Sequence, residues 1–257
     1  MIKSNFKTDL IMKKVTIRIL LVVFVLLVVL AILFGLFAYK FSSETSIMTP
    51  HETGEIVPGV FAVKDDFVNL FLVKYQDGYV AIDAGNNTET IANELQKISI
   101  NQDEIKAILL THSDADHTAL ARLSMEIPVH LPKNEEQLIN GQTNRFAIFG
   151  NQLERSYSLL VHDQVLRFGN LTIRCVDSPG HTPGSMSFLV NNRYLFTGDS
   201  TSLIDGKIGL FNDFFNMDND TQAKTLKELA KLNTVTHVFT AHYGSTNDAS
   251  NAFSDFR

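Results

Sequence analysis

The feature that most constrains the fold of this chain is a dense cluster of metal-binding residue types directly after a short apolar segment. Residues 105–110 predict a β-strand, and the stretch T-H-S-D-A-D-H-T follows it at once. Four side chains in that stretch can bind a metal: His112, Asp114, Asp116 and His117. Because a divalent ion needs ligands that converge from rigid elements, the cluster predicts a site at the end of this strand, completed from elsewhere in the chain.

Three later positions repeat the arrangement of an apolar strand followed by a polar turn with a candidate ligand. They are His181 after the predicted strand 171–177, Asp199 after 193–197, and His242 after 235–240. His181 lies in the turn S-P-G-H-T-P-G, where glycine and proline restrict the backbone. These positions can supply the missing ligands from rigid elements.

The spacing of apolar residues and turn residues predicts a mixed α/β body. Strands are expected at 60–63, 69–74, 78–83, 105–110, 129–132, 158–162, 164–168, 171–177, 186–191, 193–197 and 235–240. Helices are expected at 88–97 with Asn87 or Thr88 as cap, at 119–125, at 134–139, and at 220–232 with Asp220 as cap. Two halves, each with antiparallel strands first and helix–strand units after, predict a four-layer αβ/βα sandwich.

A run of 21 uncharged, mostly apolar residues at 19–39 precedes this body. As a helix it is long enough to span the roughly 30 Å hydrocarbon core of a bilayer. A cleaved signal peptide, which would leave a secreted protein, is the main alternative, but its apolar run is usually only about 7–15 residues long. Basic residues dominate the segment before the run, so the positive-inside bias predicts a cytoplasmic N-terminus and an extracytoplasmic body.

The expected division of the chain follows from these features. It comprises a cytoplasmic N-terminus at 1–18, a transmembrane anchor at 19–39, a linker at 40–55 and a catalytic body at 56–257.

Charge and cysteine content exclude several classes of protein. The net charge is −6, and residues 41–257 alone hold 16 basic and 27 acidic residues. A body this acidic has no general attraction for a phosphate backbone, so no nucleic-acid partner is expected. The single cysteine, Cys175, excludes an intrachain disulfide scaffold and a cysteine-rich zinc site.

Taken together, the motifs resemble those of the metallo-β-lactamase-fold hydrolases, with a core like that of glyoxalase II and the lactonases. The resemblance covers about 56–245 and rests on an H-x-D-x-D-H variant of the first motif, G-H-T-P-G, T-G-D, a late His after a strand, and Asp83-Ala-Gly85 as an early D-x-G. It implies the four-layer sandwich and a hydrolase with two divalent metal ions, with zinc as the first candidate.

The resemblance also implies a role for each candidate ligand. His112, Asp114 and His181 would form a first metal site, and Asp116, His117 and His242 a second. Asp199 would bridge both, and Asp83 would support the site from behind the ligands. A metal-bound hydroxide would attack the substrate, and Asp116 would orient it as the catalytic residue.

One position departs from the family pattern. Asp114 stands where most members have His, and a carboxylate there could shift the preference toward Fe or Mn, or leave zinc with altered affinity. If Asp114 points away, only one metal remains. The iron-binding flavodiiron members carry a flavin domain, which is not expected after Arg257, so redox activity is not favoured. Asp199 occupies the position of the Cys ligand of some β-lactamases, which argues against β-lactam hydrolysis.

We therefore expect a membrane-anchored metal-dependent hydrolase that acts on a small-molecule ester, thioester, lactone or phosphodiester. The alternative is a non-catalytic or redox-type member that keeps metal mainly for structure or electron transfer. Substrate selectivity is expected from the segments 141–156 and 200–218, with Phe211 and Tyr243 as candidate substrate contacts. Tyr243 could donate a proton to a leaving group, or it could serve packing.

Overall fold

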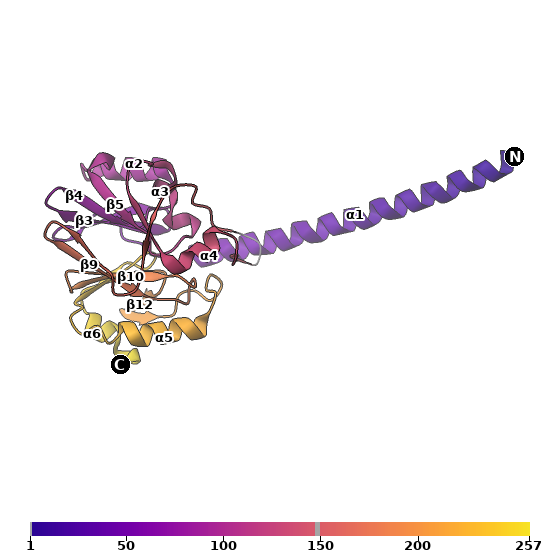
Figure 1. Ribbon diagram of the computed structural model, residues 1–257. Coiled ribbons are helices and arrows are strands. Elements are labelled where there is room, and N and C mark those ends of the chain that lie inside the picture. The colour runs from indigo at the N-terminus through magenta and orange to yellow at the C-terminus, as the bar shows by residue number, and fades with distance from the viewer. Residues whose placement is uncertain (1, 147–149) are drawn as a thin grey trace. The chain divides into compact units, whose positions relative to one another are not determined.

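The chain divides into two compact units, Met1–Ile47 and Met48–Arg257. A computed structural model describes residues 2–146 and 150–257 of them, drawn as a ribbon in Figure 1. The central part of the segment 141–156, at 147–149, lies outside the described residues.

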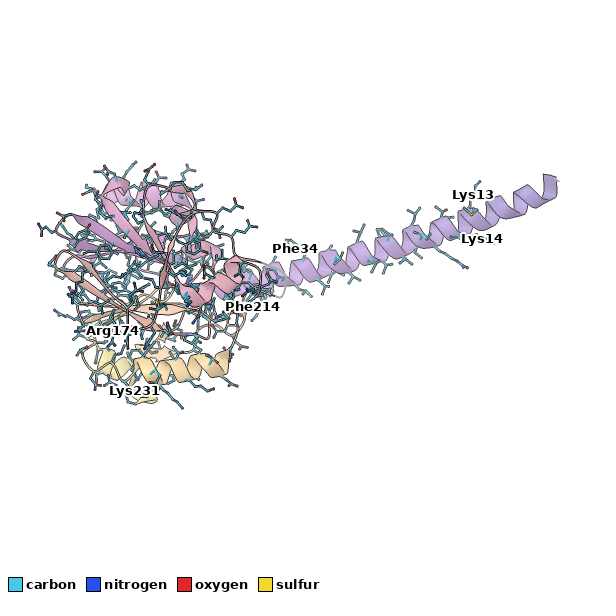
Figure 2. The ribbon with its side chains drawn as sticks, in the orientation of Figure 1. Lys13, Lys14, Phe34, Arg174, Phe214 and Lys231 are labelled. Carbon is cyan, nitrogen blue, oxygen red and sulfur yellow. The ribbon has the colours of Figure 1, made fainter. Side chains whose placement is uncertain are left out.

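The first unit is one long helix, α1 (Ile2–Thr45). Its side chains from Met12 onward are mostly exposed, including almost every large apolar one. An 18-residue window within Met12–Thr45 reaches a mean hydropathy of 3.5, which makes the helix long and apolar enough to cross a membrane, although a signal sequence would meet the same criterion. Lys13 and Lys14 lie near the N-terminal end of this helix (Figure 2).

The second unit, called the body below, is built on two sheets. Within residues 48–146 and 150–257, the first sheet has the strand order β1-β2-β3-β4-β5-β6-β7 and the second has the order β15-β14-β11-β10-β9-β8. The strand bounds of the first sheet are β1 (Gly54–Val57), β2 (Val60–Asp65), β3 (Val68–Tyr75), β4 (Gly78–Ile82), β5 (Ile105–Leu109), β6 (Val129–Pro132) and β7 (Ser158–Leu160). Those of the second are β8 (Val165–Phe168), β9 (Leu171–Asp177), β10 (Met186–Val190), β11 (Tyr194–Gly198), β14 (His237–Thr240) and β15 (Ser245–Thr246).

Helices cover the outer face of each sheet (Figure 1). Their bounds are α2 (Thr88–Lys97), α3 (Ala119–Leu123), α4 (Glu136–Ile139), α5 (Asn219–Leu229) and α6 (Ala249–Ala252), with 3₁₀ turns η1 (Gln102–Glu104), η2 (Ala115–His117), η3 (Lys133–Glu135) and η4 (Ser254–Phe256). A separate hairpin, β12 (Ser202–Ile204) with β13 (Lys207–Gly209), was not predicted. It lies in the segment 200–218, and Asp205 and Gly206 make its turn with positive φ angles of 51° and 75°.

Three apolar layers hold these elements together. One packs α2 and α3 on the first sheet through residues such as Ile91 and Leu120, and another packs α5 and α6 on the second sheet through residues such as Leu226. Between the sheets, Phe71, Phe196 and Phe239 form the centre of the middle layer, with the last two rings stacked at 4.6 Å. The predicted αβ/βα sandwich is therefore confirmed. Charged side chains such as Lys231 project from its outer surface (Figure 2).

Strand direction brings the polar turns to one edge of the sandwich. β4, β5 and β6 run parallel in the first sheet, as do β11 and β14 in the second. Their C-terminal ends therefore face the same edge within each sheet. Two backbone bonds join the sheets there, from Met186 N to Thr111 O at 2.9 Å and from Asn69 N to Ala241 O at 2.8 Å.

Two sequence expectations differ from the structure. The segment 40–55 is not a continuous linker, because α1 runs through Thr45 and the body begins at Met48, with β1 paired to β2. The cap of α5 is Asp218, whose carboxylate accepts from Thr221 N at 2.9 Å, so Asp220 is a residue of the first turn and not the cap. Asp218 and Asp220 both precede an apolar periodic stretch, and only the backbone path distinguishes them.

Candidate metal centre

The seven predicted ligands converge at this edge from the loops after four strands. His112, Asp114, Asp116 and His117 lie in the loop after β5, while His181, Asp199 and His242 follow β9, β11 and β14. The four imidazoles are 1% exposed or less, and the Asp199 side chain is 4% exposed. The Asp114 and Asp116 side chains are more open, at 15% and 23%.

The first ligand group consists of His112, Asp114 and His181. Asp114 Oδ2 lies 3.1 Å from His181 Nε2 and 3.7 Å from His112 Nε2. Ligand atoms about 2.0–2.2 Å from one tetrahedral ion stand roughly 3.3–3.6 Å apart, so these separations suit a shared metal. Asp114 therefore does not point away from the group.

The second ligand group consists of Asp116, His117 and His242. Asp116 Oδ2 lies 3.6 Å from His117 Nε2 and 3.5 Å from His242 Nε2. These separations also suit one ion.

Asp199 stands between the two groups with one oxygen toward each. Its Oδ2 lies 3.8 Å from His112 Nε2 and 3.5 Å from His181 Nε2. Its Oδ1 lies 3.5 Å from His117 Nε2 and 3.2 Å from His242 Nε2. A carboxylate in this position can bridge two ions. Glycine is needed at position 198, directly before Asp199, because a Cβ there would lie 2.4 Å from Thr111 Oγ1. The φ of Gly198 is also positive, at +52°.

An oxygen behind each imidazole holds its ring in place. These oxygens are Thr111 Oγ1 at 2.9 Å from His112 Nδ1, Asp83 Oδ2 at 3.0 Å from His117 Nδ1, Asn216 Oδ1 at 3.3 Å from His181 Nδ1, and the Phe67 carbonyl at 2.7 Å from His242 Nδ1. An Nδ1–H donated outward leaves the Nε2 lone pair free for a metal. The four side chains are thus set for metal binding through Nε2.

Asp83 contacts both ends of the loop after β5. Its carboxylate accepts from Thr111 N at 2.7 Å and from Thr111 Oγ1 at 2.9 Å, in addition to its contact with His117. The residue adopts a φ of +63°, in a conformation that few residues other than glycine adopt.

The centre carries polar atoms that the described protein atoms leave without a hydrogen bond. They are His112 Nε2, His117 Nε2 and Asp199 Oδ1, all buried. Buried polar atoms are rarely left unpaired, since each costs on the order of 1–3 kcal/mol. Their presence at one point, with imidazole nitrogens and carboxylate oxygens around it, fits divalent metal ions.

Charge is distributed unevenly over the centre. Burial disfavours protonation of His117, but Asp199, Asp116 and Asp83 outweigh it and raise the pKa of His117 well above its ordinary value. Burial and the neighbouring His117 lower the pKa of His112. The four carboxylates of Asp83, Asp114, Asp116 and Asp199 therefore make a negative centre that a cation stabilises.

Sequence reasoning missed Arg145 and Asn151, which both bind Asp114. Arg145 Nη2 lies 2.8 Å from Asp114 Oδ2, and Asn151 Nδ2 donates to Asp114 Oδ1 at 3.0 Å. Burial would raise the pKa of Asp114, yet Arg145 and His181 hold it far below its usual range. Both residues belong to the segment 141–156, whose apolar and polar residues show no regular period. The sole signal in the sequence was Asp114, a carboxylate at the position where most family members have His. Its extra negative charge favours a positively charged neighbour.

Glu135 was also missed, although it joins two of the ligand loops. Its buried carboxylate accepts from Ser113 N at 2.9 Å, Gly184 N at 3.1 Å, and the hydroxyls of Ser113 and Thr182. A Cβ on Gly184 would lie 2.3 Å from Glu135 N, so glycine permits this approach. Burial raises the pKa of Glu135 despite these donors.

Phe211 and Tyr243 lie beside the centre in a small apolar cluster with Met48 and Phe215. The Phe211 ring stands edge-on to His181 at 4.9 Å and lies 5.5 Å from the His242 ring. Tyr243 contacts Phe211 at 5.9 Å, and both side chains are buried. Phe211 thus contacts one histidine of each ligand group, and Tyr243 packs against Phe211.

A four-layer αβ/βα sandwich with two histidine–aspartate groups at the edge of its sheets defines a metal-binding protein of the metallo-β-lactamase type. Residues 63–242 match the family model of the metallo-beta-lactamase superfamily. The chain belongs to this superfamily.

Comparison with individual proteins agrees with membership of this superfamily. The chain is 26% identical over 172 residues to Glyoxylase B2 of Dictyostelium discoideum and 33% identical over 140 residues to the hydroxyacylglutathione hydrolase of Glaesserella parasuis serovar 5 (strain SH0165). These matches cover 61% and 53% of this chain, and 57% and 50% of the relatives. A metallo-beta-lactamase family protein from Thermus thermophilus superimposes with a TM-score of 0.60 over 78% of this chain and 79% of its own, at 18% identity, which establishes the fold alone.

Proposed function

We propose that the body is a metal-dependent hydrolase whose reaction takes place between the two ligand groups. The observation that carries this proposal is Asp199, which directs Oδ2 to one group and Oδ1 to the other. Bound divalent ions would supply Lewis acidity and a nucleophile from water at neutral pH. Zinc suits the imidazole-rich ligand set, while the carboxylates leave Fe or Mn open.

Asp116 is the candidate catalytic residue. Its side chain is the most exposed of the seven ligands, at 23%, so it can contact the solvent from which the nucleophile comes. Its Oδ2 faces His117 and His242, and its carboxylate can accept and hold the proton of the attacking water. The buried imidazoles are fixed from behind and serve to position the reacting groups.

A thioester is the substrate class that we favour among ester, thioester, lactone and phosphodiester. The hydroxyacylglutathione hydrolase relative supports this choice, because an acylglutathione is a thioester. Phe211 and Tyr243 would supply an apolar wall for the acyl part, beside His181 and His242. The acidic composition of residues 41–257 favours a small molecule over nucleic acid.

We further propose that α1 anchors the protein in a membrane, with the N-terminus in the cytoplasm and the body outside. The exposed apolar surface of α1 supports anchoring. The basic residues before the apolar run support the orientation. Cleavage after a signal sequence is the alternative, and it would release the body.

Replacement of Asp116 tests the hydrolase proposal. We expect Asp116→Ala to lower kcat/KM for an acyl thioester by at least about 100-fold, because removing a proton acceptor typically costs 10²–10⁴-fold. The assay uses thioester, lactone, oxoester and phosphodiester substrates with Zn, Mn or Fe. Asp220→Ala, an exposed change on α5, is the matched control and should retain full activity.

Two results would contradict the hydrolase proposal. One is wild-type protein that holds no transition metal after desalting. The other is a wild-type rate no higher than that of Asp116→Ala on every substrate, with both proteins folded. Preference for a lactone or phosphodiester would support the hydrolase proposal but contradict the choice of a thioester as its substrate.

A further inference from the structure

The two ligand groups differ in charge, because Arg145 lies against the first of them. The residue is 6% exposed, and its guanidinium lies against the first ligand group, where Nη2 is 2.8 Å from Asp114 Oδ2 and 3.5 Å from His181 Nε2. These are two of the three atoms with which that group would bind an ion. Among the described residues, Asp116 of the second ligand group pairs with histidines and with no Lys or Arg.

Three further contacts fix the position of Arg145 and Asp114. Arg145 Nη1 donates to the His181 carbonyl at 3.2 Å, and Nη2 donates to the Phe215 carbonyl at 2.7 Å. Asn151 Nδ2 holds the other oxygen of Asp114 at 3.0 Å. The guanidinium is therefore locked beside the first ligand group and cannot swing into solvent without breaking several buried bonds.

The consequence for metal binding is electrostatic. An ion bound to Asp114 Oδ2 at about 2.0–2.2 Å would stand within about 5 Å of Arg145 Nη2. At that separation a divalent ion and a guanidinium repel each other strongly in a buried site. Arg145 also offsets the charge of the Asp114 carboxylate in the first ligand group, whereas no described Lys or Arg pairs with Asp116 in the second.

We propose that Arg145 is a positioning residue that weakens metal binding at the first ligand group, so that the protein holds one ion tightly at the second ligand group and a second ion only weakly. This inference rests on the proposed function as a metal-dependent hydrolase. It assigns the tight site to Asp116, His117 and His242 with Asp199.

Metal titration of the full chain in detergent tests the inference. Metal-free protein is titrated with Zn²⁺ against a chromophoric chelator, and Co²⁺ spectra report the ligand set. We expect one tight ion in the wild type and a second that binds at least ~10-fold more weakly. Arg145→Gln should strengthen the weak site at least ~10-fold and leave the tight site unchanged, while Arg145→Lys, which keeps the charge, should stay near the wild type.

Two sets of variants separate this effect from a general disturbance. Arg155→Gln is the matched control, because Arg155 also binds several backbone carbonyls, among them that of Ala121 at 2.8 Å, but these carbonyls belong to α3 and its following loop. It should change neither site. If Arg145→Gln fails to fold, the Asp variants decide: Asp114→Asn should keep the tight ion, and Asp116→Asn should lose it.

Several results would overturn the inference. They are two ions of equal affinity in the wild type, an unchanged weak site in folded Arg145→Gln, or loss of the tight ion in Asp114→Asn with its retention in Asp116→Asn. Each can occur in a protein that hydrolyses its substrate. Absence of any bound ion would instead reject the proposed function.

Discussion

At the scale of single residues, the centre depends on groups that hold the ligands as much as on the ligands themselves. The four imidazoles are oriented by oxygens of Asp83, Thr111, Asn216 and Phe67. Of these, the sequence indicated Asp83 alone, because Asp83-Ala-Gly85 resembles the early D-x-G motif of the family, whose Asp supports the ligands. The other three contacts are not marked by any local pattern in the sequence.

Glu135 offers a test of these supporting contacts. We expect Glu135→Gln to lower the free energy of unfolding by about 2–3 kcal/mol, since an amide NH₂ would face the buried donors of Ser113 or of Thr182 and Gly184. Urea denaturation of the metal-free protein measures the change. Glu126→Gln, an exposed change, should stay within about 0.5 kcal/mol of the wild type. Equal stability of the two variants would show that Glu135 has no such role.

At the scale of elements, strands were easier to predict than the ends of helices. In β9 buried apolar residues largely alternate with less buried ones, and β10 is buried along its whole length. Both strands are bounded by turn residues, so their positions follow from the sequence. A helix cap depends on the backbone angles of one residue. Asn87 and Thr88 were both possible caps of α2, and Asp218 replaced Asp220 at α5. The hairpin β12–β13 was missed because its strands are short.

The cap of α2 can be tested with two neighbouring variants. Asn87 Oδ1 accepts from Glu89 N at 2.9 Å and from Thr90 N at 3.1 Å. We expect Asn87→Ala to cost about 1 kcal/mol of unfolding free energy, because it leaves these donors without their partner. Thr88→Ala should cost little, as alanine is the better helix former. Thermal unfolding of both variants measures the difference, and a larger loss for Thr88→Ala would place the cap at that residue instead.

At the scale of the whole molecule, the chain consists of two units with different surfaces. The body carries apolar cores of its own on both faces of each sheet, so it has what a domain needs to fold alone. The helix α1 instead exposes Leu, Val, Ile and Phe side chains along its length from Met12 on. Exposed apolar surface of this extent is typical of a segment that contacts a membrane or a partner.

This difference predicts how the two units behave when separated. We expect residues 48–257 to be soluble and to unfold in one cooperative transition, while the full chain stays with membranes after alkaline carbonate extraction. Leu26→Arg with Leu27→Arg should release the full chain, because each charge at mid-span costs about 2.5–3.5 kcal/mol. Extraction of the unaltered chain by carbonate would refute anchoring. A protein that is found outside the membrane fraction with a mass below 28.7 kDa would indicate cleavage of a signal sequence.

The sequence by itself determined the layer architecture and the family, and it singled out the candidate ligand residues. Strand periodicity, turn residues and short motifs carry those features locally, and each ligand lies in the loop that follows its strand. The tertiary structure decided which charges meet at the centre. Arg145 reaches Asp114 and Glu135 reaches Ser113 and Thr182 only because loops fold back across the edge of the sheets. An ion pair between distant residues depends on that three-dimensional path, and neither periodicity nor local propensity encodes it. The loop after β5 therefore supplies four of the seven candidate metal ligands. We propose that Arg145 makes the first ligand group bind its ion more weakly than the second.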